Sequence, residues 1–241
     1  MTRGGRVVLS TLIALPMFLV LLGLGAWQLQ RLQLKLEFIA ARDAGFAQPP
    51  AELTAQDDTL TDLAWRRVTV TGRFDHAGEF HLFRTRDGSA GYEVLTPLVR
   101  TDGAPGQVVL VDRGWVPLNR KDAGTRAEAQ VEGVVTVNGF VRIDLDARSM
   151  VTPVNDVVGN IWYVVDYAAM GTRARATLRP LVVVADATAN PGGFPIGVAK
   201  PPELPNNHLG YAFTWFSLAA ALAVIWGISL RRQLAAQDAA A

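Results

Sequence analysis

The sequence contains no cysteine among its 241 residues and only three histidines. The absence of thiols excludes disulfides, thiolate metal sites and cysteine nucleophiles, and it leaves the redox compartment open. A bound metal would need His, Met, Tyr or carboxylate ligands. The formal net charge of +1 lacks the basic excess that is typical of nucleic-acid-binding proteins, so we expect no nucleic-acid partner.

Motifs for common catalytic machinery are also missing. The sequence has no Gly-x-Ser-x-Gly elbow, no Gly-rich phosphate loop and no His-Glu-x-x-His motif. Its carboxylates are scattered, with no pair that the pattern brings together. We therefore expect that the protein is not an enzyme. A membrane-anchored periplasmic enzyme is the weakest of the three functions that we consider for this chain.

Charge is absent from two long stretches, residues 7–30 and 209–230. About 20 apolar residues in a helix cross a hydrocarbon core of roughly 30 Å. We predict transmembrane helices at 7–30 and at 205–230, where the second range includes the polar turn that precedes the helix. A signal peptide is the alternative for the first stretch, but its apolar region would be shorter.

Between these helices the periodicity changes. Residues 31–47 continue the first helix as an amphipathic extension, with apolar positions at 32, 36 and 39. Residues 48–204 then show short stretches of period two, which predict a β-rich domain, an antiparallel barrel or sandwich with short helices. The expected strands are 68–74, 79–83 as its hairpin partner, 92–99, 107–116, 131–143, 161–165 and 180–185. Asp166 is expected to cap a short helix at 167–170.

The arginines at the two ends favour one orientation. Arg3 and Arg6 precede the first span, and Arg231 and Arg232 follow the second. Because cytoplasmic flanks are enriched in Lys and Arg, we expect residues 1–6 and 231–241 in the cytoplasm and the central domain outside it. Within the membrane, a ridge of small residues at Ala219, Ala223 and Gly227 could meet Gly23 and Gly25 of the first helix, or equally a helix of a partner.

His208 is the one histidine beside a membrane span. It follows Asn206 and Asn207, so it should lie in the first turn of the second helix, where the helix dipole disfavours imidazolium. Neutral imidazole is the form that binds metal or haem iron. Tyr211 and Trp215 follow at i+3 and i+7 on the same face. The alternative is a histidine that only anchors the helix at the headgroups.

A second cluster is Asp112-Arg113-Gly114-Trp115. The guanidinium of Arg113 beside the indole of Trp115 could bind a carboxylate such as a haem propionate. The alternative is a structural salt bridge at the end of a sheet, with Trp115 in the core. His76 and His81 flank the expected hairpin turn, and we expect them to be solvated.

The order of six motifs resembles that of the Surfeit-locus (Shy-type) cytochrome c oxidase assembly factors over nearly the whole chain. The motifs are Leu24-Gly25-x-Trp27-Gln28-x-x-Arg31, Arg66-Arg67-Val68-x-Val70-x-Gly72, Gly91-Tyr92-x-Val94-x-Thr96-Pro97-Leu98, Val111-Asp112-Arg113-Gly114-Trp115-Val116-Pro117, Asn160-x-Trp162 and Asn206-Asn207-His208-x-x-Tyr211-Ala212-x-Thr214-Trp215-Phe216.

The resemblance implies a membrane protein that assists assembly of haem-copper (aa3-type) cytochrome c oxidase. It implies transient binding of haem a and its insertion into the catalytic subunit, with that subunit and the haem a synthesis machinery as partners. The family's histidine at the membrane boundary corresponds to His208, as the axial ligand of the iron. Trp27, Arg31, Arg113 and Trp115 are carried over as further candidates for haem binding.

The first span starts almost at the first residue, so we expect a bacterial inner membrane rather than an organelle. The alternative function is a scaffold that stabilises an oxidase assembly intermediate and binds no haem.

Overall fold

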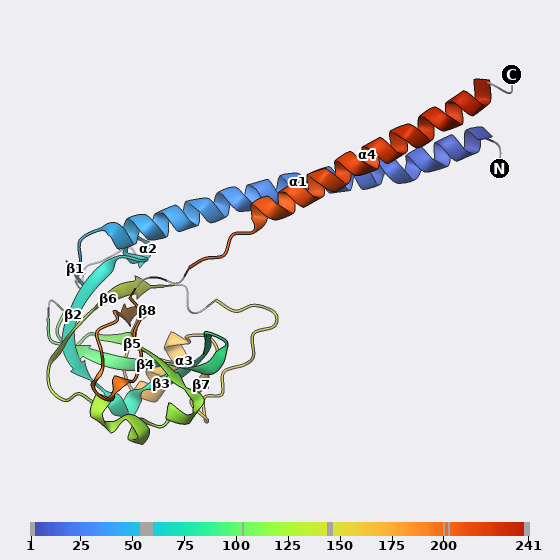
Figure 1. Cartoon of the computed structure of the whole chain (residues 1–241). Helices are drawn as coiled ribbons and strands as arrows, with labels where there is room; N and C mark the ends of the chain where they lie inside the picture. The colour runs from blue at the N-terminus through green and yellow to red at the C-terminus, as the bar shows by residue number, and fades with distance from the viewer. Residues whose placement is uncertain are drawn as a thin grey trace. The chain divides into compact units, whose positions relative to one another are not determined.

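The computed structural model describes residues 3–53, 60–102, 104–143, 147–199, 201 and 203–238. The chain forms two compact units, Met1–Ala40 with Glu203–Ala241, and Ala41–Pro202. The first unit is helical and the second is β-rich (Figure 1). The tails expected at residues 1–6 and 231–241 lie partly outside the described residues.

Two long helices make up the helical unit, α1 (Arg3–Ala47) and α4 (His208–Asp238). On each helix, buried or half-buried side chains recur in alternating steps of four and three residues. This spacing averages 3.5 and is the seam of a coiled-coil pair. The seam positions of α1 are Val7, Thr11, Ala14, Phe18, Leu21, Gly25, Gln28, Leu32 and Lys35, and those of α4 are His208, Ala212, Trp215, Ala219, Leu222, Trp226, Ser229 and Gln233.

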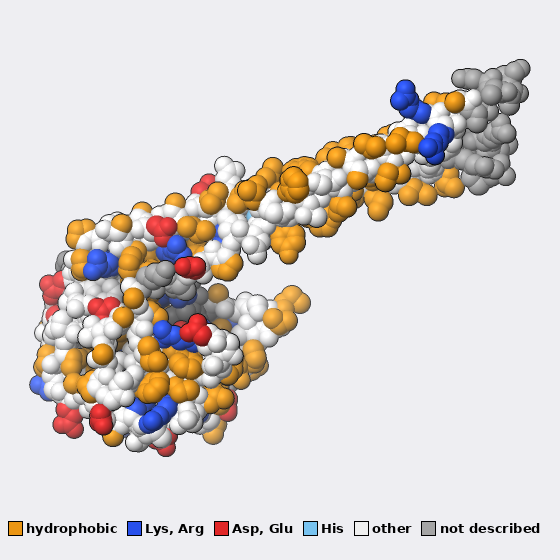
Figure 2. Space-filling model, viewed as in Figure 1, with side chains coloured by type: hydrophobic (Ala, Val, Ile, Leu, Met, Phe, Trp, Pro, Cys, Tyr) orange, Lys and Arg blue, Asp and Glu red, His pale blue; other side chains and the backbone are white. Residues whose placement is uncertain are grey.

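The faces of α1 and α4 that point away from this seam are apolar and exposed (Figure 2). Leu12, Ile13, Phe213 and Ile225 are among these exposed side chains. Such a surface is unfavourable in water and favourable in lipid. Both helices are long and apolar enough to cross a membrane, over Val7–Ala47 and His208–Ala235. The prediction of two candidate transmembrane helices at the two ends of the chain is confirmed.

The helices meet differently from the prediction. Gly25 does lie in the contact, because a Cβ there would lie 2.6 Å from the ring of Phe216. A Cβ at Gly23 or at Gly227 would meet nothing within 4 Å. The expected contact is therefore wrong at Gly23 of α1 and at Gly227 of α4. A repeat of 3.5 residues, and not a run of small residues, determines which side chains face the partner helix.

The second unit is built on one eight-stranded sheet, in the order β1-β2-β6-β8-β5-β4-β3-β7. The strands are β1 (Ala51–Glu52), β2 (Arg67–Phe74), β3 (Phe80–Arg86), β4 (Ser89–Arg100), β5 (Val108–Pro117), β6 (Val135–Arg142), β7 (Ile161–Trp162) and β8 (Leu178–Ala185). Short helices connect them, namely α2 (Leu60–Leu63), η1 (His76–Gly78), η2 (Leu118–Arg120), η3 (Ala123–Ala129), α3 (Tyr167–Ala174) and η4 (Pro191–Gly193).

The sheet closes on itself because β2 pairs with β4 as well as with β6. Strands β2, β6, β8, β5 and β4 thus form a barrel, and the predicted β-rich, barrel-like fold is confirmed. Most ladders are antiparallel, but β5 pairs with β8 in parallel. At the closure, a Cβ on Gly72 would lie 2.4 Å from the carbonyl oxygen of Val99, so the close approach of β2 to β4 needs glycine.

Two apolar clusters use the two faces of the barrel strands. All five strands contribute alternate residues to the interior cluster, whose members include Val68, Val70, Leu98, Val109, Val111, Val141, Leu181 and Val183. The intervening residues point outward and are covered by β3, β7, α3 and the connection between β7 and α3, through Phe80, Leu82, Trp162, Val165 and Met170. Asp166 caps α3, where its side chain accepts from the backbone N–H of Ala169 at 3.0 Å, as predicted.

The predicted hairpin between 68–74 and 79–83 is wrong. Strand β3 pairs with β4 and β7, while both edges of β2 are occupied by other strands. Barrel closure is the physical reason. It brings distant strands to β2, and after the turn at η1 the strand β3 pairs with the first part of β4, along the same edge whose end pairs with β2.

Candidate functional site

His208 is the first residue of α4 and follows the polar turn that the sequence predicts. Its backbone N–H donates to Oδ1 of Asn206 at 3.4 Å, and the carbonyl of Asn207 accepts the first helical bond, from Tyr211, at 3.1 Å. The asparagines therefore satisfy backbone groups at the start of the helix. His208 itself is half-buried, at a seam position that faces α1.

The imidazole of His208 has a partner on the other helix. Its Nδ1 lies 2.7 Å from Oε1 of Gln28, a residue of α1 that is only 8% exposed. An amide oxygen only accepts, so Nδ1 carries a proton, and in the neutral form of the ring it is Nε2 that has the lone pair. Histidines that ligate metals commonly donate their second ring N–H in this way, which orients the ring.

The arrangement suits a metal centre that brings most of its own ligands. Among the described residues, no group of three or more His, Asp or Glu side chains could hold a metal ion. One imidazole nitrogen is the usual protein contribution to haem iron, whose other in-plane ligands come from the porphyrin. The donor set at His208 therefore fits a haem better than a bare cation.

The predicted neighbours of His208 in the helical unit lie on the same two helices. Trp27 and Arg31 are exposed on α1, with the guanidinium carbon of Arg31 5.7 Å from the centre of the Trp27 ring. On α4, Tyr211 is exposed and Trp215 is half-buried. The described ring contacts include none between His208 and Tyr211 or Trp215.

Arg113 and Trp115 belong to the β-rich unit, and different partners hold them. Arg113 is 2% exposed, and its guanidinium donates to the carbonyl of Ala129 and, at 3.1 Å, to Oδ1 of Asn190. It also lies over the ring of Phe74, at 4.8 Å. The half-buried indole of Trp115 donates to the carbonyl of Arg84 at 3.3 Å.

No ion pair between Asp112 and Arg113 is present in the described part of β5. Oδ1 of Asp112 accepts instead from the backbone N–H of Gly114 at 2.9 Å. Burial, together with the neighbouring carboxylate of Glu93, raises the pKa of Asp112 well above its ordinary value. Burial also lowers the pKa of Arg113, to about 10, with a further contribution from Arg126.

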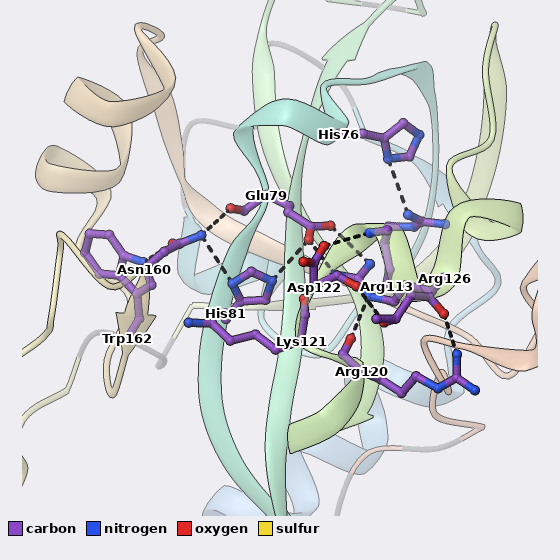
Figure 3. Close-up of polar contacts among 12 residues, drawn as sticks. His76, Glu79, His81, Arg113, Arg120, Lys121, Asp122, Arg126, Asn160 and Trp162 are labelled. Atoms are coloured by element: carbon purple, nitrogen blue, oxygen red, sulfur yellow. Dashed lines mark hydrogen bonds and ion pairs between the residues drawn. The ribbon is translucent and has the colours of Figure 1, made fainter.

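The β-rich unit contains a buried polar chain that joins five side chains (Figure 3). The indole N–H of Trp162 donates to Oδ1 of Asn160 at 2.8 Å, and Nδ2 of Asn160 lies 3.2 Å from Nδ1 of His81. Nε2 of His81 lies 3.1 Å from Oε1 of Glu79, and Arg126 contacts both oxygens of Glu79. Because indole N–H only donates, the orientation of the amide follows, and Nδ1 of His81 is an acceptor.

This network decides the state of its charges. Nε2 of His81 donates to Oε1 of Glu79, and Nδ1 accepts from Asn160. Burial opposes ionisation of Glu79, but the hydrogen bond from His81 and the guanidinium of Arg126 outweigh it, so its pKa is lowered. The expectation of a solvated His81 is therefore wrong. Its place in β3 turns the side chain into the domain. His76 is half-buried, with Nε2 2.9 Å from the carbonyl of Val131.

Comparison with known proteins supplies the family. The profile described as "SURF1 family" matches residues 15–220 of the chain. The chain belongs to the SURF1 family. It is 36% identical to a SURF1-like protein of Monosiga brevicollis over 96% of this chain and 90% of that protein. It is 34% identical to Surfeit locus protein 1 of Homo sapiens, over 85% and 72% of the two chains. A SURF1-like protein of Rickettsia felis is 29% identical, over 92% and 97%.

The SURF1 match extends from the first span to the second, and so it includes both Gln28 and His208. The sequence identified His208 as a candidate ligand. Gln28 was named only as part of a motif, and no role was predicted for it. The signal that could have identified Gln28 was its polar side chain in a mostly apolar stretch of α1, at a position that faces α4. Sequence reasoning also missed the chain from Trp162 to Arg126, because its residues come from three separate segments, 79–81, 126 and 160–162.

Proposed function

We propose that this SURF1 family protein is an assembly factor for haem-copper (aa3-type) cytochrome c oxidase. In this proposal it holds haem a at the outer interface of the membrane and assists its insertion into the catalytic subunit. The protein works as a carrier and not as an enzyme. The single observation that carries the proposal is the hydrogen bond from Nδ1 of His208 to Gln28, which leaves Nε2 able to bind iron at the start of a membrane helix.

The cargo and the site match in polarity. Haem a carries a long farnesyl tail and, on its opposite edge, two propionates. Exposed apolar faces of α1 and α4 suit the tail in lipid, and Nε2 of His208 suits the iron. Trp27, Tyr211 and Trp215 supply flat aromatic surface on the same pair of helices.

Arg31 is the better candidate of the two arginines for a propionate. Its guanidinium is exposed and lies over Trp27, whereas the donors of Arg113 already serve Ala129 and Asn190. A propionate at Arg113 would have to displace these bonds in a buried site. We therefore assign the polar edge of haem a to Arg31 and a structural role to Arg113 and Trp115.

One protein ligand suits a carrier that must release its cargo. A second strong ligand from the protein would slow transfer to the oxidase. The proposed partners are accordingly the catalytic subunit, which accepts haem a, and the machinery that synthesises it. The proposed location is a bacterial inner membrane that the chain crosses twice, with the β-rich domain in the periplasm and both termini in the cytoplasm. The basic residues Arg231 and Arg232 support this orientation.

The test is the visible spectrum of the full-length protein purified from cells that make haem a. The wild type should carry haem a with the spectrum of a histidine-ligated iron, and His208→Ala should lose most of it. A wild type without haem a would overturn the carrier function. If oxidase subunits still co-purified with it, a haem-free scaffold would replace the proposal.

A further inference from the structure

Five aliphatic side chains in the segment between β6 and β7 lie on the surface of the β-rich unit. This segment projects from the barrel (Figure 1). Met150 is fully exposed, and Val151, Val154 and Val158 are 90%, 79% and 94% exposed, with Val157 also exposed. Isolated exposed aliphatic residues are common, but contiguous apolar patches mark sites of interaction.

Hydrogen bonds hold the first apolar tip in a defined turn. The backbone N–H of Thr152 donates to the carbonyl of Ser149 at 3.1 Å, and the backbone N–H of Ser149 donates to the hydroxyl of Thr152 at 2.9 Å. The two hydroxyls lie 2.8 Å apart. Met150 and Val151 occupy the two central positions of this turn, so its fold directs both side chains outward.

A second turn presents Val157 and Val158 in the same manner. Asp156 and Ile161 exchange backbone hydrogen bonds at 2.8 and 2.9 Å, and the carboxylate of Asp156 accepts from the N–H of Gly159 at 2.8 Å. Lys121 also donates to the carbonyl of Gly159 at 2.7 Å. The acidic side chain of Asp156 is thereby used inside the turn.

Asn155 connects the two turns to the body of the domain. Its Oδ1 accepts from the backbone N–H groups of Tyr163 and Val164, and its Nδ2 donates to the carbonyl of Val164 at 3.2 Å. The turns are thus supported structures. Met150, Val151, Val154 and Val158 bury little of their surface in the fold, whereas Val157 is 42% exposed, so the packing of the domain does not explain the first four.

We propose that these two turns, with Val154 between them, insert the aliphatic side chains of Met150, Val151, Val154, Val157 and Val158 into the surface of the lipid bilayer. The β-rich unit is joined to both candidate membrane helices at short range. Helix α1 runs into it without a break, and only residues 203–207 separate it from α4. A bilayer is therefore always present at high effective concentration.

The chemistry of the tips favours lipid over a protein partner. Protein interfaces depend on Trp, Tyr and Arg anchors, and valine is under-represented among such anchors. Four of the five tip residues are valine. Arg148 is exposed beside the first tip, where a guanidinium can meet lipid phosphate. Aliphatic insertion needs no anionic lipid, so the contact should persist in zwitterionic bilayers and at high salt. The contact of the turns with lipid does not depend on haem.

The absence of cysteine makes the test direct. Single cysteines are introduced into the full chain as Val151→Cys and Val158→Cys at the tips, with Ala187→Cys and Glu132→Cys as exposed controls elsewhere on the domain. Each variant is labelled with an environment-sensitive fluorophore and reconstituted in phosphatidylcholine nanodiscs. Tip labels should shift to the blue, be quenched by brominated acyl chains and be protected from aqueous iodide. The controls should show the opposite behaviour.

A further variant checks that the aliphatic side chains cause the insertion. Val151→Asp with the label at position 158 should lose the blue shift and the protection, with an unchanged thermal midpoint because residue 151 packs against nothing. Tip labels as accessible to iodide as the controls would overturn the proposal. Protection that appears only in native membranes, and not in pure lipid, would overturn it in favour of a protein partner.

Discussion

Replacing Gln28 with leucine removes the acceptor that faces Nδ1 of His208 and places an apolar side chain at this position of the seam between α1 and α4. The bond is 2.7 Å long and Gln28 is 8% exposed, so solvent has little access to take over the role of the amide. Loss of such a supporting group typically costs about 10–100-fold in metal affinity or activity. Since a tenfold change is about 1.4 kcal/mol, we expect a loss of about 1.4–2.7 kcal/mol in haem binding.

The assay titrates haem a into the purified full-length protein and follows the Soret band. Gln28→Leu should weaken binding by about tenfold or more, within the range for supporting groups, while circular dichroism stays unchanged. Gln28→Glu keeps an acceptor and should bind nearly as the wild type. Gln30→Leu is the matched control, because Gln30 is exposed on the same helix. Wild-type affinity and spectrum in Gln28→Leu would refute the reasoning that this bond prepares His208 for iron.

Three further predictions concern stability, each measured by unfolding of the purified chain. Gly25→Ala should destabilise by about 1–3 kcal/mol through overpacking, whereas Gly23→Ala, in open space, should not. Glu79→Gln should cost roughly 3–5 kcal/mol at pH 7, because Arg126 is left buried and unpaired. Since the pKa of Glu79 is lowered from 4.5, the wild type should lose this contribution as the pH falls below that value, and the variant should not. Asp112→Asn should stabilise at pH 7, because the pKa of Asp112 is raised and its ionisation opposes folding; the gain should shrink toward pH 3.8.

The proposed site depends on a pairing that neither helix shows alone. His208 and Gln28 are 180 residues apart in the chain, and they meet because both occupy the seam of one helix pair. A histidine at the start of a membrane helix is compatible with a headgroup anchor or with a ligand. The amide that faces its Nδ1 favours the ligand, since it leaves Nε2 as the free nitrogen.

The two apolar turns and the proposed haem site are separate features of the protein. The proposal for the turns concerns a contact of the β-rich domain with the membrane surface, and its test has no haem in it. If both proposals hold, the lipid contact restricts the motion of the domain relative to the bilayer in which the haem site lies. The contact would then limit the orientations in which the protein can approach an oxidase.

Local sequence properties determined the architecture. The length of an uncharged apolar stretch decides whether a helix can cross a membrane, and that length can be counted for residues 7–30 and 209–230. The change to a period of two likewise predicts strands without any knowledge of their partners. For the same reason His208 was identified as a boundary residue, because the polar turn before it and the apolar helix after it are adjacent in the chain.

Tertiary structure decided everything that depends on which faces meet. Barrel closure gave β2 two distant partners in place of the expected hairpin, and the side-chain direction in β3 buried His81 against Glu79. Gln28 and Gly25 lie at seam positions that face α4, whereas Gly23 lies outside the seam. Such contacts join residues far apart in sequence, and short-range periodicity contains no information about register or pairing. The partner of His208, on which the proposed function depends, belongs to this second class.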